Sequence, residues 1–541
     1  MKKLIVFSLL LALLPFLANS QSADIPVKAG AKIALVQTEY GQVRGYVHNG
    51  IYIYKGIPYA QAERFMPPAK PKSWEGVRSS MTWGPVCPLI DPTTQVNDES
   101  EFIFQHDWGY DSEDCLRLNI WTQGINDGKK RPVMVWLHGG GYSAGSSQEL
   151  PSYDGESLAK SGDVVLVSIN HRLNVIGFLD LSNFGEKYKA SGNAGMIDIV
   201  AALEWVKNNI ANFGGDPNNV TIFGQSGGGG KVTTLMNAPS AKGLFHKAIV
   251  QSGATAGFQE QEITKRVGAA VVAELGLNAS QIDSIQKVPY DKLAAASKRA
   301  LQKVREQLTA EGKMITGFGF GWSPVRDGNF LPYQPSQPEA LAISSQVPMM
   351  IGATKNEFTP FANMSLRNAS LDAVKAFLQK RYGDKTDAFI TAVKKAYPND
   401  TKPEDLASVD DRFRLGTVNQ ANMKSATNTA PVYMYMFSWQ SPVFDGAFKA
   451  VHCMELPFVF NNIAKCEEMT GGGKEAYALA SKMSQAWINF ARYGNPSHKG
   501  LPNWPKYTAE SGATMFFDNK CEIRNHHDKE LLEIITSTMN Q

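Results

Sequence analysis

Apolar residues in this chain form short continuous runs that alternate with segments of helical spacing. Residues 132–137, 164–169, 220–223 and 248–250 are rich in Val, Ile, Leu and Met, which is typical of strands buried on both faces. Apolar positions recur at helical spacing over residues 196–213. The alternation predicts an α/β fold with a central, mostly parallel sheet and helices on both faces.

Other stretches extend this pattern. Residues 32–59 alternate apolar and polar positions between glycines, as short antiparallel strands do, while residues 349–352 and 431–437 are weaker strand candidates. Beyond residue 257 the spacing turns mainly helical, which predicts helical insertions. Because no internal repeat or break in composition occurs, we expect residues 21–541 to form a single domain.

The first twenty residues differ from the rest. Lys2 and Lys3 precede an apolar run over residues 4–17, and Ala18-Asn19-Ser20 follows as a cleavage pattern, which predicts a secretory signal peptide over residues 1–20. That run is short for a membrane span, and no later run reaches ~18 apolar residues. We therefore expect a secreted or periplasmic protein without a membrane anchor.

Composition narrows the partners. The chain is 43% hydrophobic and 19% charged, with a net charge of only +3 and no long Lys/Arg tract, so nothing favours nucleic acid as a partner. Export makes its five cysteines candidates for disulfides rather than metal ligands. The oligomeric state is left open.

A glycine-flanked serine directly follows the run at 220–223. Residues 224–228 read Gly-Gln-Ser-Gly-Gly, which places Ser226 between a buried strand and a helix-compatible segment. Such a turn leaves no space for flanking Cβ atoms and lifts the hydroxyl clear of the sheet. The glycines before Lys231 also resemble a phosphate-binding loop, but Gln225 and Val232 stand where that motif needs Gly and Ser or Thr. We therefore interpret Ser226 as a nucleophile.

A serine nucleophile needs an oxyanion hole. Residues 138–142 read His-Gly-Gly-Gly-Tyr directly after the run at 132–137. Three consecutive glycines can turn their backbone N–H groups toward a ligand, as such loops do in esterases. We expect this loop to bind the oxyanion.

One histidine downstream of Ser226 has the context of a general base. His452 precedes an apolar, strand-like stretch at residues 456–460, which suits a base held at a sheet edge. The other downstream histidines lie at a helix-to-strand junction, in a polar loop or in a charged stretch; they are His246, His498, His526 and His527. Glu357 follows a strand candidate and could orient the base, whereas its rival Asp327 has the context of a turn residue.

With these motifs the chain resembles the type-B carboxylesterase family, which includes cholinesterases and bacterial para-nitrobenzyl esterases, within the α/β-hydrolase superfamily. The resemblance covers essentially the whole mature chain. Residues 56–60 and Trp74 resemble the family's N-terminal block, residues 112–120 resemble its Glu-Asp-Cys-Leu signature, and residues 209–217 resemble its most specific segment.

The resemblance implies an α/β-hydrolase fold and roles for individual residues. Ser226 would be the nucleophile, Glu357 the acid and His452 the base. The oxyanion donors implied are the backbones of Gly140, Gly141 and Gly227. No metal or cofactor is required for this chemistry.

The resemblance also implies a disulfide between Cys87 and Cys115. A second bridge, between Cys453 and Cys466, is predicted because the intervening stretch could double back and because exported cysteines are commonly paired. Cys521 would then stay unpaired.

The sequence departs from the family pattern around the implied triad. Gln225 replaces the usual Glu before the serine and Gly227 the usual Ala after it, while Phe358 and Cys453 each stand where glycine is usual. None of these changes removes a catalytic group. The loss of a carboxylate beside the nucleophile disfavours choline-like substrates.

The sequence thus predicts an exported serine carboxylic-ester hydrolase that acts on a small-molecule ester through an acyl-enzyme. An amidase, or an esterase for carbohydrate or plant-wall esters, could use the same triad because specificity depends on pocket loops. A non-catalytic adhesion module is a further alternative, although such proteins typically lose the nucleophile or the base.

Overall fold

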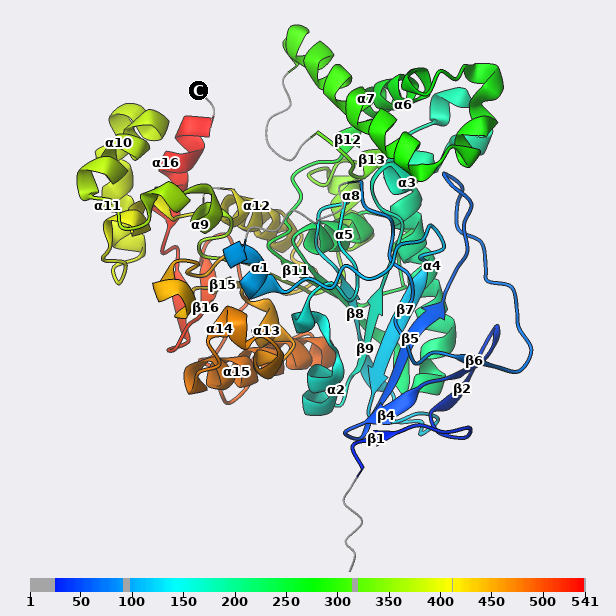
Figure 1. Cartoon of the computed structure of the whole chain (residues 1–541). Helices are drawn as coiled ribbons and strands as arrows, with labels where there is room; N and C mark the ends of the chain where they lie inside the picture. The colour runs from blue at the N-terminus through cyan, green and yellow to red at the C-terminus, as the bar shows by residue number, and fades with distance from the viewer. Residues whose placement is uncertain (1–24, 91–97, 314–319, 411, 540–541) are drawn as a thin grey trace, which may run out of the picture.

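The computed structural model describes residues 25–90, 98–313, 320–410 and 412–539 of the 541-residue chain. The predicted signal peptide, residues 1–20, lies outside them. Within the described residues a twelve-stranded sheet runs through the molecule (Figure 1). Its strands, in spatial order, are β1 (Val27–Lys28), β4 (Tyr46–His48), β5 (Ile51–Pro58), β7 (Arg117–Thr122), β9 (Val165–Ile169), β8 (Arg131–Leu137), β10 (Gly215–Gln225), β11 (Lys247–Gln251), β14 (Met349–Thr354), β15 (Val432–Phe437), β16 (Ala513–Phe517) and β17 (Glu522–Asn525).

The centre of this sheet is parallel. Every neighbouring pair from β9 to β16 runs in the same direction, with Phe223 of β10 between Trp136 of β8 and Ile249 of β11. The strands outside this range pair antiparallel, as the glycine-punctuated pattern of residues 32–59 predicts for the N-terminal side. Parallel strands bring their carboxyl ends to one edge, where ligand sites of α/β folds form.

Both faces of the central strands are buried, which explains their continuous apolar runs. Val133 and Val135 of β8 pack into a core on one face, and Met134 and Trp136 pack into a second core on the other. The first core includes side chains of α4 (Ala194–Asn209), α5 (Gly227–Met236) and α12 (Phe413–Ala426). The second includes side chains of α2 (Glu156–Gly162), α13 (Leu456–Val459) and α15 (Lys474–Tyr493).

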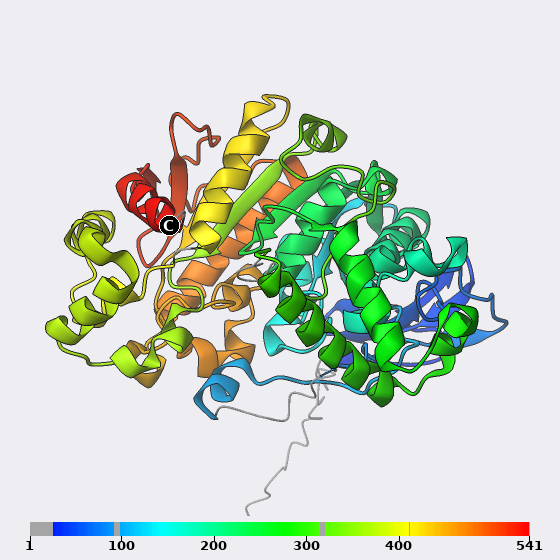
Figure 2. The same ribbon diagram turned by 90° about the horizontal axis from the view of Figure 1, so that it is seen from above.

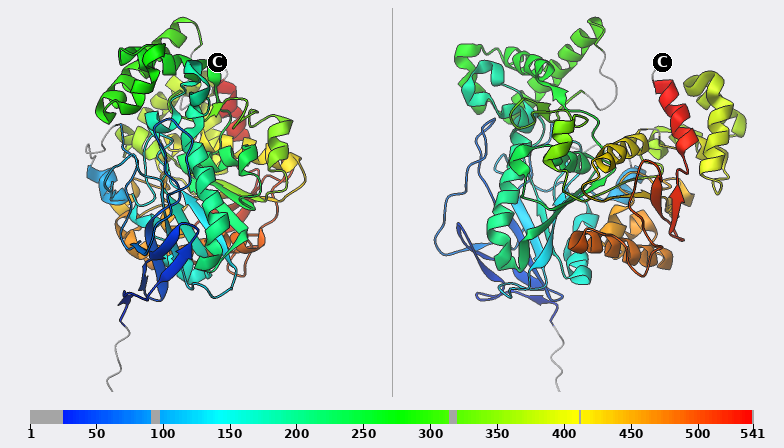
Figure 3. Two further views of the ribbon diagram at one scale, coloured as in Figure 1. Left: turned by 90° about the vertical axis from the view of Figure 1, so that its right-hand side faces the viewer. Right: turned by 180° about the vertical axis from the view of Figure 1, so that it is seen from behind.

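Helical insertions extend the molecule beyond these layers. The paired helices α6 (Gln261–Glu274) and α7 (Tyr290–Ala310) lie at one end, and α10 (Leu371–Tyr382), α11 (Thr386–Ala396) and α16 (Lys529–Met539) lie at the other (Figures 2 and 3). The second group has an apolar core of its own. Small sheets complete the fold: β2 (Leu35–Thr38), β3 (Gly41–Arg44) and β6 (Val77–Ser79) form one, and β12 (Gln259–Glu260) and β13 (Val325–Arg326) form another.

The predicted strands at 132–137, 164–169, 220–223, 248–250, 349–352 and 431–437 and the helix within 196–213 are confirmed. The strand-like interpretation of residues 456–460 is wrong, because this stretch forms the short helix α13 with Pro457 in its first turn. Proline suits that position because its fixed φ matches the helix and its missing N–H has no partner to lose there. In the part of the chain that the structure describes, no helix is long and apolar enough to span a bilayer.

The predicted disulfides are absent from the structure, where all five cysteines are free thiols. Cys87 and Cys115 are buried and hydrogen-bonded to each other without a covalent bond, and this contact, with burial, raises the pKa of Cys115. Cys453 and Cys466 are separated by the helical α13 rather than by a strand that doubles back. The Cys453 thiol instead donates to Gln225 Oε1 over 3.2 Å.

Candidate active site

Ser226 occupies the sharp turn between β10 and α5. Its φ of 57° and ψ of −124° place a non-glycine residue in a strained region of the backbone. The flanking glycines are sterically required: a Cβ on Gly224 would lie 2.5 Å from the carbonyl carbon of Gly228, and one on Gly228 would overlap the carbonyl oxygen of Leu137. The turn predicted from Gly-Gln-Ser-Gly-Gly therefore forms as a nucleophile elbow.

The three glycines after β8 lie directly against this turn. Gly140 and Gly141 have φ angles of 79° and 63°, which glycine adopts without strain. A Cβ on Gly227 would lie 2.5 Å from the Gly141 nitrogen, so the two backbones are in close contact. Gly227 is also the first residue of α5, whose N–H has no acceptor within the helix. The structure thus brings together the three residues predicted to donate to an oxyanion.

A buried lysine joins the helix to the glycine loop. Lys231 on α5 donates from Nζ to the backbone oxygen of His138 over 2.9 Å. Burial lowers the pKa of Lys231 to about 7, although the nearby Glu149 opposes that shift. Burial also raises the pKa of Glu149 to about 7, and Glu149 accepts a hydrogen bond from Tyr153. In the sequence Lys231 stands out only for its resemblance to the lysine of a phosphate-binding loop, and no local signal indicates this contact.

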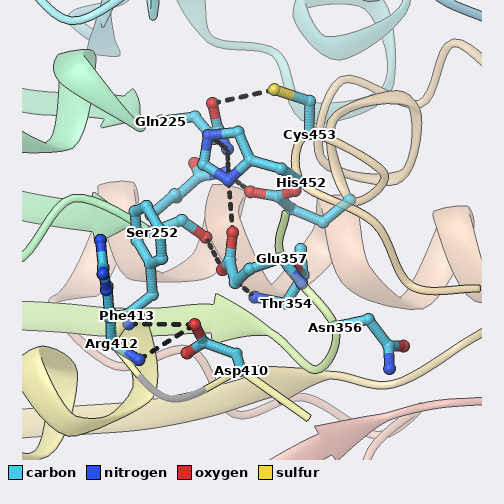
Figure 4. A network of polar contacts seen from close by, with 12 residues as sticks. Gln225, Ser252, Thr354, Asn356, Glu357, Asp410, Arg412, Phe413, His452 and Cys453 are labelled. Carbon is cyan, nitrogen blue, oxygen red and sulfur yellow. Dashed lines mark hydrogen bonds and ion pairs between the residues drawn. The ribbon is translucent and has the colours of Figure 1, made fainter. Parts of the chain in front are cut away.

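His452 and Glu357 form a buried hydrogen-bonded pair, in which His452 Nδ1 faces Glu357 Oε2 (Figure 4). The other carboxylate oxygen, Oε1, accepts from Ser252 Oγ over 2.6 Å and from the Thr354 N–H over 2.8 Å. The backbone N–H of His452 also donates to the backbone oxygen of Glu357 over 3.0 Å. The acid is therefore held by two further donors and can fix the orientation of the imidazole.

The rest of the His452 ring is enclosed by side chains. Phe358 stacks on it with ring centroids 4.1 Å apart, and Phe413 lies 5.3 Å away. The amide nitrogen of Gln225 lies 3.2 Å from His452 Nε2 (Figure 4). Two departures from the family pattern, Gln225 and Phe358, thus contact the proposed base itself.

Ser226 and His452 line one cavity of about 810 Å³, together with Gly140, Gly141 and Gly227. Within the described residues no hydrogen bond joins His452, the implied base, to Oγ of Ser226, the implied nucleophile, in this conformation. Catalytic hydrogen bonds are often long in unliganded sites and shorten once substrate binds. The residues that line the cavity include the aromatic side chains of Phe104, Trp108, Tyr142, Tyr153, Phe320, Trp322, Phe358, Phe361 and Phe413.

Two more buried carboxyl groups lie near the pair. Burial, followed by the charge on Glu357, raises the pKa of both Asp410 and Glu455 to about 7. Asp410 accepts hydrogen bonds from the backbone N–H groups of Arg412, Phe413 and Arg414. Nothing in the sequence pattern indicated these groups. Ser252 could have been found, because it directly follows the strand next to β10.

The residues set aside from the sequence have structural contacts. His246 Nδ1 accepts from the Val220 N–H over 3.1 Å, and His498 Nε2 contacts the backbone oxygen of Lys482. Asp327 caps a turn by accepting from the N–H groups of Asn329 and Leu331, as expected. Among the described residues no group of three or more His, Cys, Asp or Glu side chains is placed to hold a metal ion.

Known carboxylesterases resemble this chain over nearly its whole length. The Carboxylesterase family profile matches residues 32–535, nearly the full described length. The chain belongs to the carboxylesterase family. It is 36% identical over 509 residues to the para-nitrobenzyl esterase of Bacillus subtilis, an alignment that covers 92% of this chain and 97% of that protein. It is also 36% identical over 519 residues to the human cocaine esterase, covering 87% and 86% of the two chains.

Solved structures show the same likeness. An esterase from the anaerobe Clostridium hathewayi, described as able to hydrolyse aliphatic aromatic polyesters, matches with a TM-score of 0.82 at 37% identity, over 94% of this chain and 98% of that one. A para-nitrobenzyl esterase structure matches with a TM-score of 0.75 at 34% identity, over 93% and 99%. The fold is therefore that of the α/β-hydrolases, and the protein is a carboxylesterase, as the sequence predicted.

Proposed function

We propose that this carboxylesterase hydrolyses its substrates through a Ser226, His452 and Glu357 triad and an acyl-enzyme intermediate. The strongest support is the placement of the nucleophile elbow, the glycine loop and the His452–Glu357 pair around one cavity. The strain at Ser226 supports a catalytic role, because such backbone conformations cluster at active sites.

In the proposed reaction His452 Nε2 takes the proton of Ser226 Oγ as the oxygen attacks the ester carbonyl. Glu357 keeps the remaining ring proton on Nδ1 and stabilises the imidazolium that forms. The backbone N–H groups of Gly140, Gly141 and Gly227 would stabilise the oxyanion, the alcohol would leave with the proton from His452, and water would then hydrolyse the acyl-enzyme.

For this step His452 Nε2 must exchange its contact with the Gln225 amide for one with Ser226 Oγ. Gln225 can accommodate the exchange, because its carbonyl oxygen is also held by the Cys453 thiol. The neutral amide of Gln225 cannot stabilise the His452 imidazolium as the family's usual Glu could. We therefore propose that Glu357 provides the negative charge that stabilises this imidazolium.

The proposed substrates are esters with an apolar, preferably aromatic, acyl or alcohol group. Several aromatic rings line the cavity and can stack on such a group. The Clostridium hathewayi esterase can hydrolyse aliphatic aromatic polyesters, which supports the same preference. Export through the signal peptide at residues 1–20 is part of the proposal and rests on the sequence alone.

The test compares wild type and Ser226→Ala with para-nitrophenyl acetate and its anilide counterpart. We expect Ser226→Ala to lose activity by several orders of magnitude with unchanged circular dichroism. A fluorophosphonate should label wild type at Ser226, as read by peptide mass spectrometry. Activity that persists in Ser226→Ala would overturn the triad. Faster hydrolysis of the anilide than of the ester would show that the protein prefers amides.

A further inference from the structure

Five phenylalanine rings form a continuous series from the catalytic cavity to the protein surface. Phe104 and Phe361 line the cavity, and their ring centroids lie 6.2 Å apart. From Phe361 the contacts continue to Phe448, Phe444 and Phe102, with centroid separations of 5.6, 5.6 and 5.5 Å. We call these five residues the aromatic track.

The track is assembled from separate parts of the chain. Phe102 and Phe104 belong to α1 (Asp98–Phe104), and Phe361 belongs to α9 (Thr359–Ala362). The other two rings come from the segment after β15, where α14 (Glu467–Thr470) packs against both that segment and α1 (Figure 1). Long-range packing, not local sequence, therefore places the rings side by side.

The outer end of the track is exposed. Phe102 is 48% and Phe444 38% accessible to solvent, whereas Phe448 beneath them is buried. Phe444 also has a φ of 53°, an uncommon conformation for a bulky residue that costs free energy. An exposed ring held by a strained backbone is unfavourable for folding alone. This cost favours a binding role for the surface end.

The cavity limits what it can enclose. At about 810 Å³ it can bury a drug-sized ester but not the whole of a polymeric one. The remainder of a longer substrate must leave the cavity along its wall. Phe104 and Phe361 belong to that wall, and through the buried Phe448 their rings connect to the exposed rings of Phe444 and Phe102, where an emerging chain can bind.

We propose that the aromatic track is a substrate subsite, which binds the distal apolar part of esters too long for the cavity. This inference rests on the proposed esterase function. Its surface residues, Phe102 and Phe444, would determine chain-length specificity without contacting the reacting atoms. A track that served only as packing would affect stability and would not distinguish long from short esters.

The experiment compares wild type with the double variant Phe102→Gln/Phe444→Asn. Asn tolerates the positive φ at position 444, and both positions are exposed, so the fold should persist. The probes are para-nitrophenyl acetate as the short ester, with a soluble aliphatic and a soluble aliphatic-aromatic polyester oligomer, each larger than the cavity, as the two long esters. All are used below their solubility limits.

We expect kcat/KM of the double variant to fall roughly tenfold for at least one long ester, equivalent to about 1.4 kcal/mol, and to stay within about twofold for the acetate. Tyr493→Gln is the matched control, because Tyr493 is 72% exposed at the end of α15, beside Gly494 and away from the cavity. For this control, kcat/KM should match that of wild type for both the long esters and the acetate.

Equal losses for long and short esters, or no loss for either long ester, would overturn the subsite. The aromatic track would then be a packing feature only. Failure of the proposed function gives a different result, because wild type would then leave para-nitrophenyl acetate unhydrolysed.

Discussion

Lys231 Nζ donates to the backbone oxygen of His138 over 2.9 Å, inside a fully buried environment. This bond connects the helix that follows Ser226 to the start of the glycine loop. The proposed oxyanion donors on the two segments can act together only if their separation is fixed, since a misplacement of about 1 Å can cost ~100-fold in rate. We infer that Lys231 positions the loop.

Lys231→Met keeps the side-chain length and removes the donor. We expect kcat to fall roughly tenfold to a hundredfold with little change in KM, because the oxyanion forms only in the transition state. Steady-state kinetics on para-nitrophenyl acetate measure this split. Lys424→Met is the control, because Lys424 also donates to backbone oxygens, those of Ser344 and Ser345, at a site outside the cavity. A control that lost kcat equally would rule out the positioning role.

Ser252→Ala tests whether the second donor to Glu357 supports catalysis. Its hydroxyl lies 2.6 Å from Glu357 Oε1, and hydrogen bonds to charged groups contribute about 1.5–3 kcal/mol. We expect kcat/KM to fall about tenfold while the Thr354 N–H still holds the carboxylate. Ser484→Ala removes a buried hydroxyl from α15 and should leave the rate unchanged. Equal rates for wild type and Ser252→Ala would show that the donor is dispensable.

The pH profile should identify the base. Because the proposed mechanism requires neutral His452, kcat/KM should rise from acid toward neutral pH and then level off. The profile is measured with a neutral ester, so that the substrate does not titrate. A rate that is highest in acid and falls by about pH 7 would instead indicate a carboxylate mechanism.

Glu455→Gln tests a buried carboxyl group beside the site. Burial and Glu357 raise its pKa from 4.5 to about 7, so the folded protein retains a proton that the unfolded chain releases. Stability should therefore fall as pH rises from about 4.5 to about 7 and then stay level. Gln cannot ionise. Between about pH 5 and pH 8 the free energy of unfolding should therefore fall by up to about 3 kcal/mol less in the variant than in wild type. Urea unfolding at both pH values measures this, and parallel losses would contradict it.

How much the sequence predicts depends on the range of the interactions. The central strands follow from continuous apolar runs, because burial on both faces leaves that local signature. The elbow at Ser226 is equally local, since its glycines are required by contacts within the turn. Leu456–Val459 was misassigned because a short apolar stretch has no distinguishing period, and only tertiary packing makes it a helix.

The contacts around His452 could not be predicted from the sequence, because they too depend on tertiary packing. Gln225 and His452 are 227 positions apart, and their contact depends on how β10 meets the loop after β15. The cysteines show the limit of a compositional argument: export favours pairing, but the Cys453 side chain is directed to Gln225 by the positive φ of 72° at its own backbone and by the helix that follows.

Gly227→Ala tests how closely the elbow and the oxyanion loop are fitted. Alanine is usual at this position in the family, yet here its Cβ would lie 2.2 Å from the Gly141 carbonyl oxygen, so the loop would have to move away. We expect kcat to fall at least tenfold with a change in melting temperature of only a few degrees, because Gly141 has open space beside it and can shift. Gly243→Ala, at a positive φ on a surface turn, is the control for strain without a steric overlap and should lower stability but not kcat. If Gly227→Ala kept wild-type kcat, the two segments would not need the close contact seen here, and the oxyanion would depend on fewer donors than the three glycines proposed.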